Sequence, residues 1–593
     1  MILRALYDYY HRCGDSLAPE GLEYKEIAFA IVIDNEGNFK RIENMLGSNK
    51  LVVKSNGRTI KSDPNHLWDN WAYVLGLSGA NLLLEDESLD NEKKENRDKE
   101  IKKNKRCFKA FVEYVRNLAS EYPENTDLKA VVSFYDKNVD LFKLVQNSDQ
   151  WDVVKKNLTK NISFLVEGDL QIVAEKGAIL SYHQSKTSTD SIGTSVCLVT
   201  GDRCEPLLTF SKIQLGKFSD TKLISFQKKQ GYDSYGKKQG ENAAISPKAE
   251  FAVTTALKKL VSYNSHNKYT IGDRIYVFWS STSSEIGRLV EDTVFSFFTY
   301  SKEDQDNPNK NLEYIKRVFN SIYTGKKPTE SNDMFYILGL FPANKARIAV
   351  SYWEEVSVQQ FAGRILKHIY DMDIVRREGS FSNYWGVRSM LKATSLNGDI
   401  EKNCAPNLPD AVVKSIFQGI PYPTSLYQAC IRRIRAEVGK EINGKKIDPV
   451  DITRAAIIKA YLNRLNDNNN KKLEIMLDKE NQNHGYLCGR LFAVLDKIQE
   501  DANGIHSIRE RYMNSASATP ATVFATIINL STHHIEKLNT GSQVFYEKLK
   551  QEIISKLPAD GFPSHLDLQD QGRFFVGYYH QRQDFFTAKD NNE

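Results

Sequence analysis

Two hydrophobic periods follow one another along the first part of the chain. Residues 1–12 (MILRALYDYYHR) repeat apolar side chains at helical spacing, and residues 24–34 (YKEIAFAIVID) form an apolar run that ends at the turn sequence DNEG. The run predicts a β-strand, and residues 38–45 (NFKRIENM) predict the strand that returns after the turn. Residues 51–55 predict a third strand, so the chain is expected to open with a helix and a small sheet.

A long charged segment separates this opening from the middle of the chain. Residues 91–119 are almost entirely charged in their first half and amphipathic in their second, which predicts one long helix with a solvated start. The segments that follow alternate between strand patterns and helix patterns. Strands are expected at 171–177, 195–201 and 273–281, and a strand–turn–strand unit at 335–355. Helices are expected at 247–263, with Ser246 as N-cap and Pro247 as the first helical residue, and at 356–372.

The strand patterns stop after about Gly379. Five helix-periodic segments, most of them bounded by Pro, Gly, Asn or Asp, cover residues 421–439, 448–465, 485–504, 519–538 and 545–557. The predicted fold class is therefore α+β: a mixed sheet and helix body followed by an all-helical C-terminal bundle. The expected regions are an N-terminal α/β region 1–130, a central α+β body 131–380, a helical region 381–465, an Asn-rich linker 466–475 and a C-terminal helical bundle 476–593.

The composition of the chain excludes only a few classes of function. The 593 residues include 80 basic and 75 acidic side chains, for a net charge of +5, so any basic surface must be local. The chain has no apolar stretch of roughly the 18 residues that a membrane span needs, and Arg4 and Asp8 argue against a signal peptide. Seven scattered cysteines, an odd number, indicate reduced thiols and a cytoplasmic protein without membrane partners.

Few patterns in the sequence indicate catalysis or metal binding. Cys197 and Cys204 form the only close cysteine pair, but six residues separate them, whereas zinc knuckles usually have about two to four. His533 and His534 adjoin on a predicted helix, where neighbouring side chains point in different directions. No nucleophile elbow, HExxH motif or paired carboxylates occur in a suitable context. No metal and no cofactor are expected.

The stretch 231–240 (GYDSYGKKQG) nearly matches a phosphate-binding loop. Lys238 stands where a Ser or Thr would bind magnesium, Gly240 interrupts a following helix, and the next helix begins only at Ser246-Pro247. A nucleotide hydrolase is therefore the weaker interpretation. Lysines that neutralise phosphates and tyrosines that stack on bases favour a nucleic-acid contact. A solvent loop folded over its own aromatic side chains remains the alternative.

Several sequence blocks together resemble one protein family, the large subunit of the type I-C CRISPR Cascade complex. The matching blocks are MILRALYDYYHR, LAPEGLEYKEIAFAIVID, HLWDNWAYVLG, SYGKKQGENAAIS followed by FAVTTAL, FYILGLFPANKARIAVSYW, SASATPATVF and GYYHQR. They run from Met1 to Arg582, and their joint order is more specific than any one block.

The resemblance implies a protein without catalytic activity that works in an RNA-guided complex. Such a subunit reads the protospacer-adjacent motif in duplex DNA, helps to open the duplex into an R-loop, and provides part of the site where a helicase-nuclease is recruited for antiviral defence. Guide RNA reads the rest of the target by base pairing, a division of labour also found in Cas9. The implied partners are the backbone, guide-end and small subunits, the guide RNA, the target DNA and the helicase-nuclease. An enzyme, either a nucleotide hydrolase or a metal-dependent nuclease, is the competing hypothesis.

Candidate contact residues can be chosen from the chemistry of DNA recognition. Asn or Gln bonds adenine and Arg or Lys bonds guanine in the major groove, while Lys and Arg also hold phosphates. The candidates for reading the motif are Lys25, Arg58, Lys61, Asn65 and Asn70. Alternatively, Asn70 is a helix cap or turn former and Lys25 an exposed strand lysine. The candidates for backbone contact are Lys237, Lys238, Gln239, Asn242, Arg432 and Arg433. Salt bridging is the alternative for the arginines, and a solvated helix face for the charged run 93–106.

A second protein product is also predicted. In the family that the chain resembles, the helical C-terminus is translated separately as the small subunit. Met476 lies just after the Asn-rich linker, and a product that begins there would contain three substantial helices. The alternative is that Met476 is an ordinary linker residue.

Overall fold

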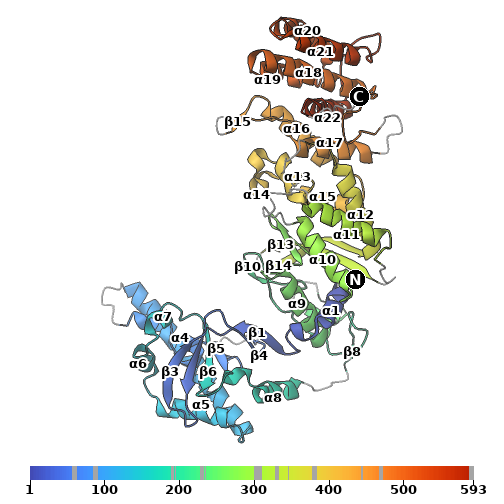
Figure 1. Ribbon diagram of the computed structural model, residues 1–593. Helices are drawn as coiled ribbons and strands as arrows, with labels where there is room; N and C mark the ends of the chain where they lie inside the picture. The colour runs from blue at the N-terminus through green and yellow to red at the C-terminus, as the bar shows by residue number, and fades with distance from the viewer. Residues whose placement is uncertain are drawn as a thin grey trace. The chain divides into compact units, whose positions relative to one another are not determined.

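The computed structural model divides the chain into two compact units, each described by itself (Figure 1). The N-terminal unit comprises Leu6–Ser211 and Ser225–Leu257, and the C-terminal unit comprises Met1–Ala5, Lys212–Ile224 and Lys258–Glu593. The residues that the structure describes are 1–55, 63–84, 91–187, 193, 195–226, 233, 235–298, 310–327, 333–344, 346–376, 384–442, 445–465 and 472–586. Small sheets in the N-terminal and central parts and helices toward the C-terminus confirm the predicted α+β class.

A four-stranded sheet with the order β3-β2-β6-β5 forms the centre of the N-terminal unit. Its strands are β2 (Phe29–Ile33), β3 (Phe39–Asn44), β5 (Trp68–Asn70) and β6 (Asn161–Val166). The predicted pair β2–β3 is antiparallel, and Asp34 holds its turn by accepting bonds from the amides of Glu36 and Asn38. Strand β6, which the sequence patterns did not single out, runs parallel to β2.

The predicted strand over residues 24–34 is in fact two strands. β1 (Leu22–Glu26) pairs with β4 (Asn49–Val53) in a separate two-stranded sheet, while β2 belongs to the central sheet. The chain changes partners at Ile27, whose amide bonds Ser48, and at Ala28, whose amide bonds Asn161. A continuous apolar run cannot reveal this change, because both strands are apolar and adjoin directly.

The first part of the chain contains the helices α1 (Ile2–Cys13), α2 (Trp71–Val74), α3 (Gly79–Leu82), α4 (Asn91–Glu121), α5 (Thr126–Lys137), α6 (Leu141–Gln146), α7 (Trp151–Val154), α8 (Gly177–Thr187) and α9 (Pro247–Val261). Helices α2 and α5 pack on strands of the central sheet, and α4 packs on both of them. The long helix α4 is exposed over its charged first half and buries Cys107, Phe111 and Val115 in its second, as predicted. The predicted boundary between residues 130 and 131 falls within α5.

One predicted strand is wrong. Residues 171–177 contain the 3-10 helix η2 (Val173–Glu175) instead. Ile172, Val173 and Ala174 are consecutive and all buried in the core of the unit. A short apolar run of this kind fits either conformation, and only packing decides between them.

An antiparallel sheet with the order β11-β12-β13-β14 begins the main body of the C-terminal unit. Its strands are β11 (Lys268–Ile271), β12 (Arg274–Ser280), β13 (Met334–Asn344) and β14 (Arg347–Ser357), which confirms the predicted strand–turn–strand. The helices α10 (Glu285–Phe298), α11 (Lys310–Tyr323) and α12 (Val358–Met372) belong to the same unit. Ser357 caps α12 by accepting a bond from the amide of Gln360.

Residues Lys212–Ile224 add a small antiparallel pair to this unit, β9 (Ile213–Leu215) and β10 (Phe218–Thr221). After α12, the described residues of the unit are helical apart from a minor hairpin of β15 (Glu441–Ile442) and β16 (Lys445–Lys446). The helices are α13 (Val387–Thr394), α14 (Ile400–Asn403), α15 (Leu408–Gln418), α16 (Thr424–Glu437), α17 (Ile452–Arg464), α18 (His484–Asn503), α19 (Ser507–Ala516), α20 (Pro520–Ile535), α21 (Thr540–Ile554) and α22 (Leu568–Asp584). Within 472–586, the part after Met476 therefore holds five helices rather than the three expected.

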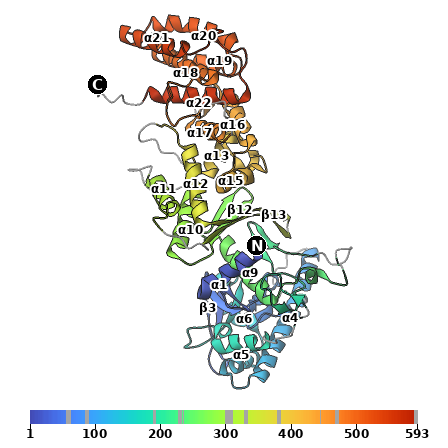
Figure 2. The ribbon, with the colours of Figure 1, turned by 90° about the vertical axis from the view of Figure 1, so that its right-hand side faces the viewer.

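Helix α22, which the periodicity did not single out, joins the two ends of this helical part. Both views show α22 between α18 and α17, with α20 and α21 beyond α18 (Figures 1 and 2). Every residue from Gln571 to Gln581 is buried, so this part of the helix has no exposed polar stripe for an amphipathic pattern to detect. One apolar core runs without interruption from the β11–β14 sheet to α22.

Candidate nucleic-acid interface

Among the candidates for reading the motif that lie in the described residues, Lys25 is the one with a cationic side chain. It lies on β1 directly opposite Lys50 in the β1–β4 register, and its ammonium sits 5.6 Å from the centre of the Trp68 ring. Lys50 forms an ion pair with Glu175 at 3.3 Å, whereas Lys25 has no carboxylate partner among the described residues. Glu175 compensates the charge of Lys50, so Lys25 is the member of this pair that can meet an anionic ligand.

Asn65 and Asn70 both have structural contacts around one buried carboxylate. Asp69, 1% exposed, accepts the amide of Asn65 at 3.0 Å and that of Asn70 at 2.8 Å. The side-chain oxygen of Asn70 accepts the amide of Ala72 at 3.1 Å and so caps α2, while Asn65 is only 5% exposed. The structure thus shows the helix cap that was the alternative for Asn70, and base reading by either side chain stays a prediction. Arg58 and Lys61 lie outside the described residues.

The signature loop, residues 235–245, is held in place along its C-terminal half. Gly240 donates its amide to Leu208, and Leu198 and Leu207 donate theirs to Ala244 and Ile245. Gly240 lies so close to the neighbouring segment that an added Cβ would stand 1.9 Å from the carbonyl oxygen of Leu207. Only glycine permits this approach.

The N-terminal half of the signature loop presents its side chains to solvent. Tyr235 is fully exposed at φ +52°, and Gln239 has φ +44°, a region that residues other than glycine seldom adopt. Lys237 and Lys238 are exposed and have no ion-pair partner among the described residues. Asn242 donates to the Gln239 carbonyl at 2.9 Å, so these two candidates shape the loop from inside.

The loop does not lead into a helix as a phosphate-binding loop does. Gln239–Ala243 form a 3-10 helix, and α9 begins at Pro247 after Ser246 has capped it through the amide of Ala249. The glycines of the loop therefore do not lead directly into the N-terminus of α9, where a phosphate would bind. This agrees with the sequence analysis, which expected the next helix to begin only at Ser246-Pro247.

The two candidate arginines of α16 differ in their surroundings. Arg433 is paired with Glu437, which in turn pairs with Arg454, so salt bridging describes this residue. Arg432 is exposed and has no such partner among the described residues. It lines an open cavity of about 500 Å³ together with Gln428, Ile431, Arg435, Ala436 and Leu568. Of the pair, Arg432 is free to meet an anion.

A second basic surface lies on α4, where the sequence indicated only a charged run. Its members are exposed and lack ion-pair partners among the described residues; they are Lys102, Lys103, Lys105, Arg106 and Lys109. Other charges of the helix are paired, such as Lys99 with Glu95 at 2.6 Å. Within two turns the helix thus presents an uncompensated positive face, and the clustering of K and R at 102–109 was the signal for it.

Met476 is 63% exposed in the segment between α17 and α18, a position that suits either of the two interpretations.

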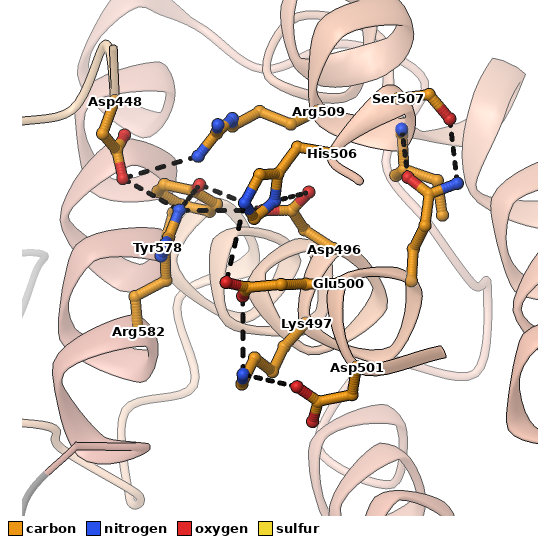
Figure 3. A network of polar contacts seen from close by, with 12 residues as sticks. Asp448, Asp496, Lys497, Glu500, Asp501, His506, Ser507, Arg509, Tyr578 and Arg582 are labelled. Carbon is orange, nitrogen blue, oxygen red and sulfur yellow. Dashed lines mark hydrogen bonds and ion pairs between the residues drawn. The ribbon is translucent and has the colours of Figure 1, made fainter. Parts of the chain in front are cut away.

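A partly buried polar network ties the helices after Met476 to the part of the unit before it (Figure 3). Arg582 of α22 binds Asp448 at 2.8 Å and Asp496 at 3.7 Å, and it donates to Tyr578 at 2.9 Å.

His506 extends this network on the side of α18. Its Nδ1 lies 3.2 Å from Asp496, which is 1% exposed, and its Nε2 lies 3.6 Å from Glu500. Each of these charges has a partner, so the network braces helices from α18 to α22. Sequence reasoning missed it because its members lie on separate elements.

Neither a metal centre nor a membrane span is found in the described part of the chain. It contains no group of three or more His, Cys, Asp or Glu side chains that could hold a metal ion. Among the same residues, no helix combines the length and the apolar character needed to cross a bilayer.

Comparison with known proteins places the chain in a family. No curated protein sequence matches it. A family profile described as CRISPR-associated protein (Cas_Csd1) matches residues 6–586, nearly the whole chain. The match covers both units and agrees in its CRISPR association with the resemblance found in the sequence blocks. The chain belongs to this family of CRISPR-associated proteins.

Proposed function

We propose that the chain is the large, non-catalytic subunit of a type I-C Cascade complex. In this role it recognises the protospacer-adjacent motif in duplex DNA, helps to form the R-loop, and contributes to the site that recruits the helicase-nuclease. It works in the cytoplasm with the backbone, guide-end and small subunits and the guide RNA. The family membership supports this proposal, and the exposed cations of the N-terminal unit are compatible with it.

The observation that carries the proposal is the presentation of Lys237 and Lys238. Both cations are exposed and lack an ion-pair partner among the described residues, and the close approach of Gly240 to Leu207 fixes the loop that bears them. A fixed loop contacts phosphates at a lower entropic cost than a mobile one, because its backbone is already ordered. Lys25 and the basic face of α4 add positive charge within the same unit.

The experiment measures binding of the assembled complex to duplex targets over a range of salt concentrations. The variant Lys237→Ala/Lys238→Ala removes two phosphate contacts, so the slope of log Kobs against log salt should fall in magnitude by about 1.8. Motif preference should not change. Lys129→Ala/Lys156→Ala is the matched control, because both lysines are exposed in the same unit and their loss removes the same charge. An unchanged slope in the loop variant would remove the loop from the interface.

The enzyme hypothesis has a separate test. The purified chain should hydrolyse no ATP and cut no DNA with Mg²⁺, Mn²⁺ or Zn²⁺. Activity of the chain alone that Lys237→Ala abolishes would overturn the proposal. A complex that binds all duplexes equally, whatever sequence flanks the target, would also overturn it.

We also propose that translation from Met476 yields a separate small subunit. This product would contain α18 to α22 but would lack Asp448, which binds Arg582 at 2.8 Å in the full chain. It would also expose the face of α22 that packs on α17, including Gly572, where an added Cβ would stand 3.0 Å from Ile458 of α17 and 2.2 Å from the Tyr427 hydroxyl of α16. The product should therefore be stable only with partners on this face. Intact-mass analysis of the complex should find a chain that begins at Met476, and replacing that codon with a non-start codon should remove it.

A further inference from the structure

Two thiols that the proposed function does not use lie side by side in the N-terminal unit. β7 (Ser195–Val196) and β8 (Arg203–Cys204) form a hairpin in which Ser195 faces Cys204. Cys197 continues β7 and bonds through its amide to the carbonyl of Asp202. Side chains two residues apart on a strand share one face, so Cys197 and Cys204 are diagonal neighbours on the same face of the hairpin. They are 1% and 7% exposed.

The surroundings of Cys197 favour its thiolate form. The amide of Ser246 donates to its sulfur at 3.4 Å, and Ser246 is the residue that caps α9. The sulfur therefore lies at the positive end of a helix of 15 residues. Burial raises the pKa of this thiol, but bonds from the amides of Ser246, Thr200 and Val199 and from the Thr200 hydroxyl outweigh burial and lower the pKa to about 7.

Cys204 has the opposite character. Burial raises its pKa, and so do the neighbouring charge of Cys197 and the hydrogen bond between the two side chains. Cys204 is thus the protonated partner that donates to the sulfur of Cys197. The other thiols with shifted pKa lack this arrangement: burial raises the pKa of Cys430 strongly and that of Cys488 to about 12, and it also raises the pKa of Cys404.

We propose that Cys197 and Cys204 form an oxidisable dithiol that hydrogen peroxide converts into a disulfide. A small oxidant is required because both sulfurs are buried. The Cys197 thiolate attacks one peroxide oxygen, the O–O bond breaks, and the sulfur becomes a sulfenic acid while hydroxide leaves. The Cys204 sulfur then attacks the Cys197 sulfur, the S–O bond breaks, and the proton of Cys204 and the leaving hydroxide form water. The two cysteines lose two electrons, and peroxide is reduced to one hydroxide ion and one water molecule.

The oxidation has a structural consequence next to the signature loop. A disulfide sulfur is neutral and a much weaker acceptor than a thiolate, so the Ser246 amide loses a charge-assisted bond. That bond connects the hairpin to the residue directly after Ile245, the end of the loop. Oxidation should therefore loosen the C-terminal anchor of the loop, and amide hydrogen exchange at Ser246 should become faster.

The test uses the full chain, reduced and then exposed to dilute hydrogen peroxide. After alkylation of remaining thiols and proteolysis, the expected product is a Cys197–Cys204 crosslinked peptide that is two hydrogens lighter than the reduced pair. In Cys204→Ser the sulfenic acid has no resolving thiol, so dimedone, added as the oxidised chain is denatured to expose the buried sulfur, should label Cys197. In Cys197→Ser no adduct should form at Cys204. Cys404, which is only half-buried, is the control within the chain.

Two results would overturn the proposal. One is oxidation of Cys404 before any change at the pair, because exposure rather than the local environment would then control reactivity. The other is the absence of both the crosslink in the wild-type chain and the dimedone adduct in Cys204→Ser. The wild-type measurement needs no variant to fold, so the proposal stays testable if a serine variant is unstable.

Discussion

The close approach at Gly240 permits a quantitative test of how the signature loop is held. The substitution Gly240→Ala adds a methyl group to a crowded position. The new Cβ would stand 1.9 Å from the Leu207 carbonyl oxygen, 3.0 Å from the Leu207 carbonyl carbon and 3.1 Å from the Leu208 carbonyl oxygen. These are backbone atoms that cannot rotate away. The loop must move by roughly 1.5 Å to restore normal van der Waals separation. Its bond from the Gly240 amide to Leu208 is lost at the same time.

The expected cost is the sum of overpacking and the lost bond. Overpacking costs about 1–3 kcal/mol, and one backbone hydrogen bond is worth about 1 kcal/mol. A local free energy of opening that falls by about 2–4 kcal/mol corresponds to roughly 30- to 700-fold faster exchange, since 1.4 kcal/mol is tenfold. The amides of Leu198 and Leu207, which bond Ala244 and Ile245, are the reporters, and amide hydrogen exchange with mass spectrometry is the assay.

Gly236→Ala separates steric contact from backbone strain. Gly236 has φ +78° and nothing within 4 Å of an added Cβ, so the substitution costs about 1–2 kcal/mol of left-handed strain without touching a neighbour. Exchange at Leu198 and Leu207 should stay as in the wild-type chain. If Gly240→Ala also leaves these amides unchanged, the close approach does not hold the loop and the reasoning fails.

Three further predictions concern the cap of α2, the ion pair between Arg582 and Asp448, and the pH dependence of stability. Asn70→Ala should lower the free energy of unfolding by about 0.5–2 kcal/mol through loss of the α2 cap, whereas Asn70→Ser keeps the cap. A serine variant that is stable but changes the motif preference of the complex would assign base reading to Asn70. A stable serine variant with unchanged preference would leave Asn70 as a cap. Arg582→Ala should cost about 1.5–3 kcal/mol in chemical denaturation, because it removes the 2.8 Å bond to Asp448 and the contact with buried Asp496. Asp448 is 34% exposed and keeps Arg509 at 3.6 Å, so the loss stays below that for a fully buried, unpaired charge. A loss below about 0.5 kcal/mol would contradict a bracing role for Arg582. Burial lowers the pKa of His368 to about 4 and that of His580 to about 3, below the value of about 6.5 that histidine has in the unfolded chain. Their neutral forms therefore stabilise the fold fully above about pH 6.5. This contribution is lost as the pH falls toward 4 for His368 and toward 3 for His580. Denaturation midpoints measured from neutral to mildly acidic pH should fall, and a flat profile would contradict the burial of both imidazoles.

Sequence patterns predicted the elements whose signals are local. The periodicity of α4, the strand–turn–strand of β13 and β14, and the capping of α9 by Ser246 were all recognisable, because each depends on residues within a few positions of one another. The 3-10 helix at Val173–Glu175 and the break between β1 and β2 were not, because short apolar runs fit several conformations.

The candidate interface was predicted less completely than the fold. Lysines 237 and 238 could be chosen from the glycines and aromatic residues around them, but the anchor at Leu207 could not, because it pairs residues far apart in the chain. The spacing of the charged residues along α16 could not show that Glu437 forms an ion pair with Arg433 and that Arg432 stays exposed. The basic face of α4 was likewise hidden within a run of charges.

The sequence by itself determined the α+β class, with small sheets in the N-terminal and central parts and helices toward the C-terminus, because hydrophobic period and turn residues act locally. The resemblance of its ordered blocks to a CRISPR family was equally available. Only the tertiary structure decided which strands pair, which charges are neutralised, and which thiols meet. Those outcomes depend on contacts between distant residues, and no local pattern specifies such contacts.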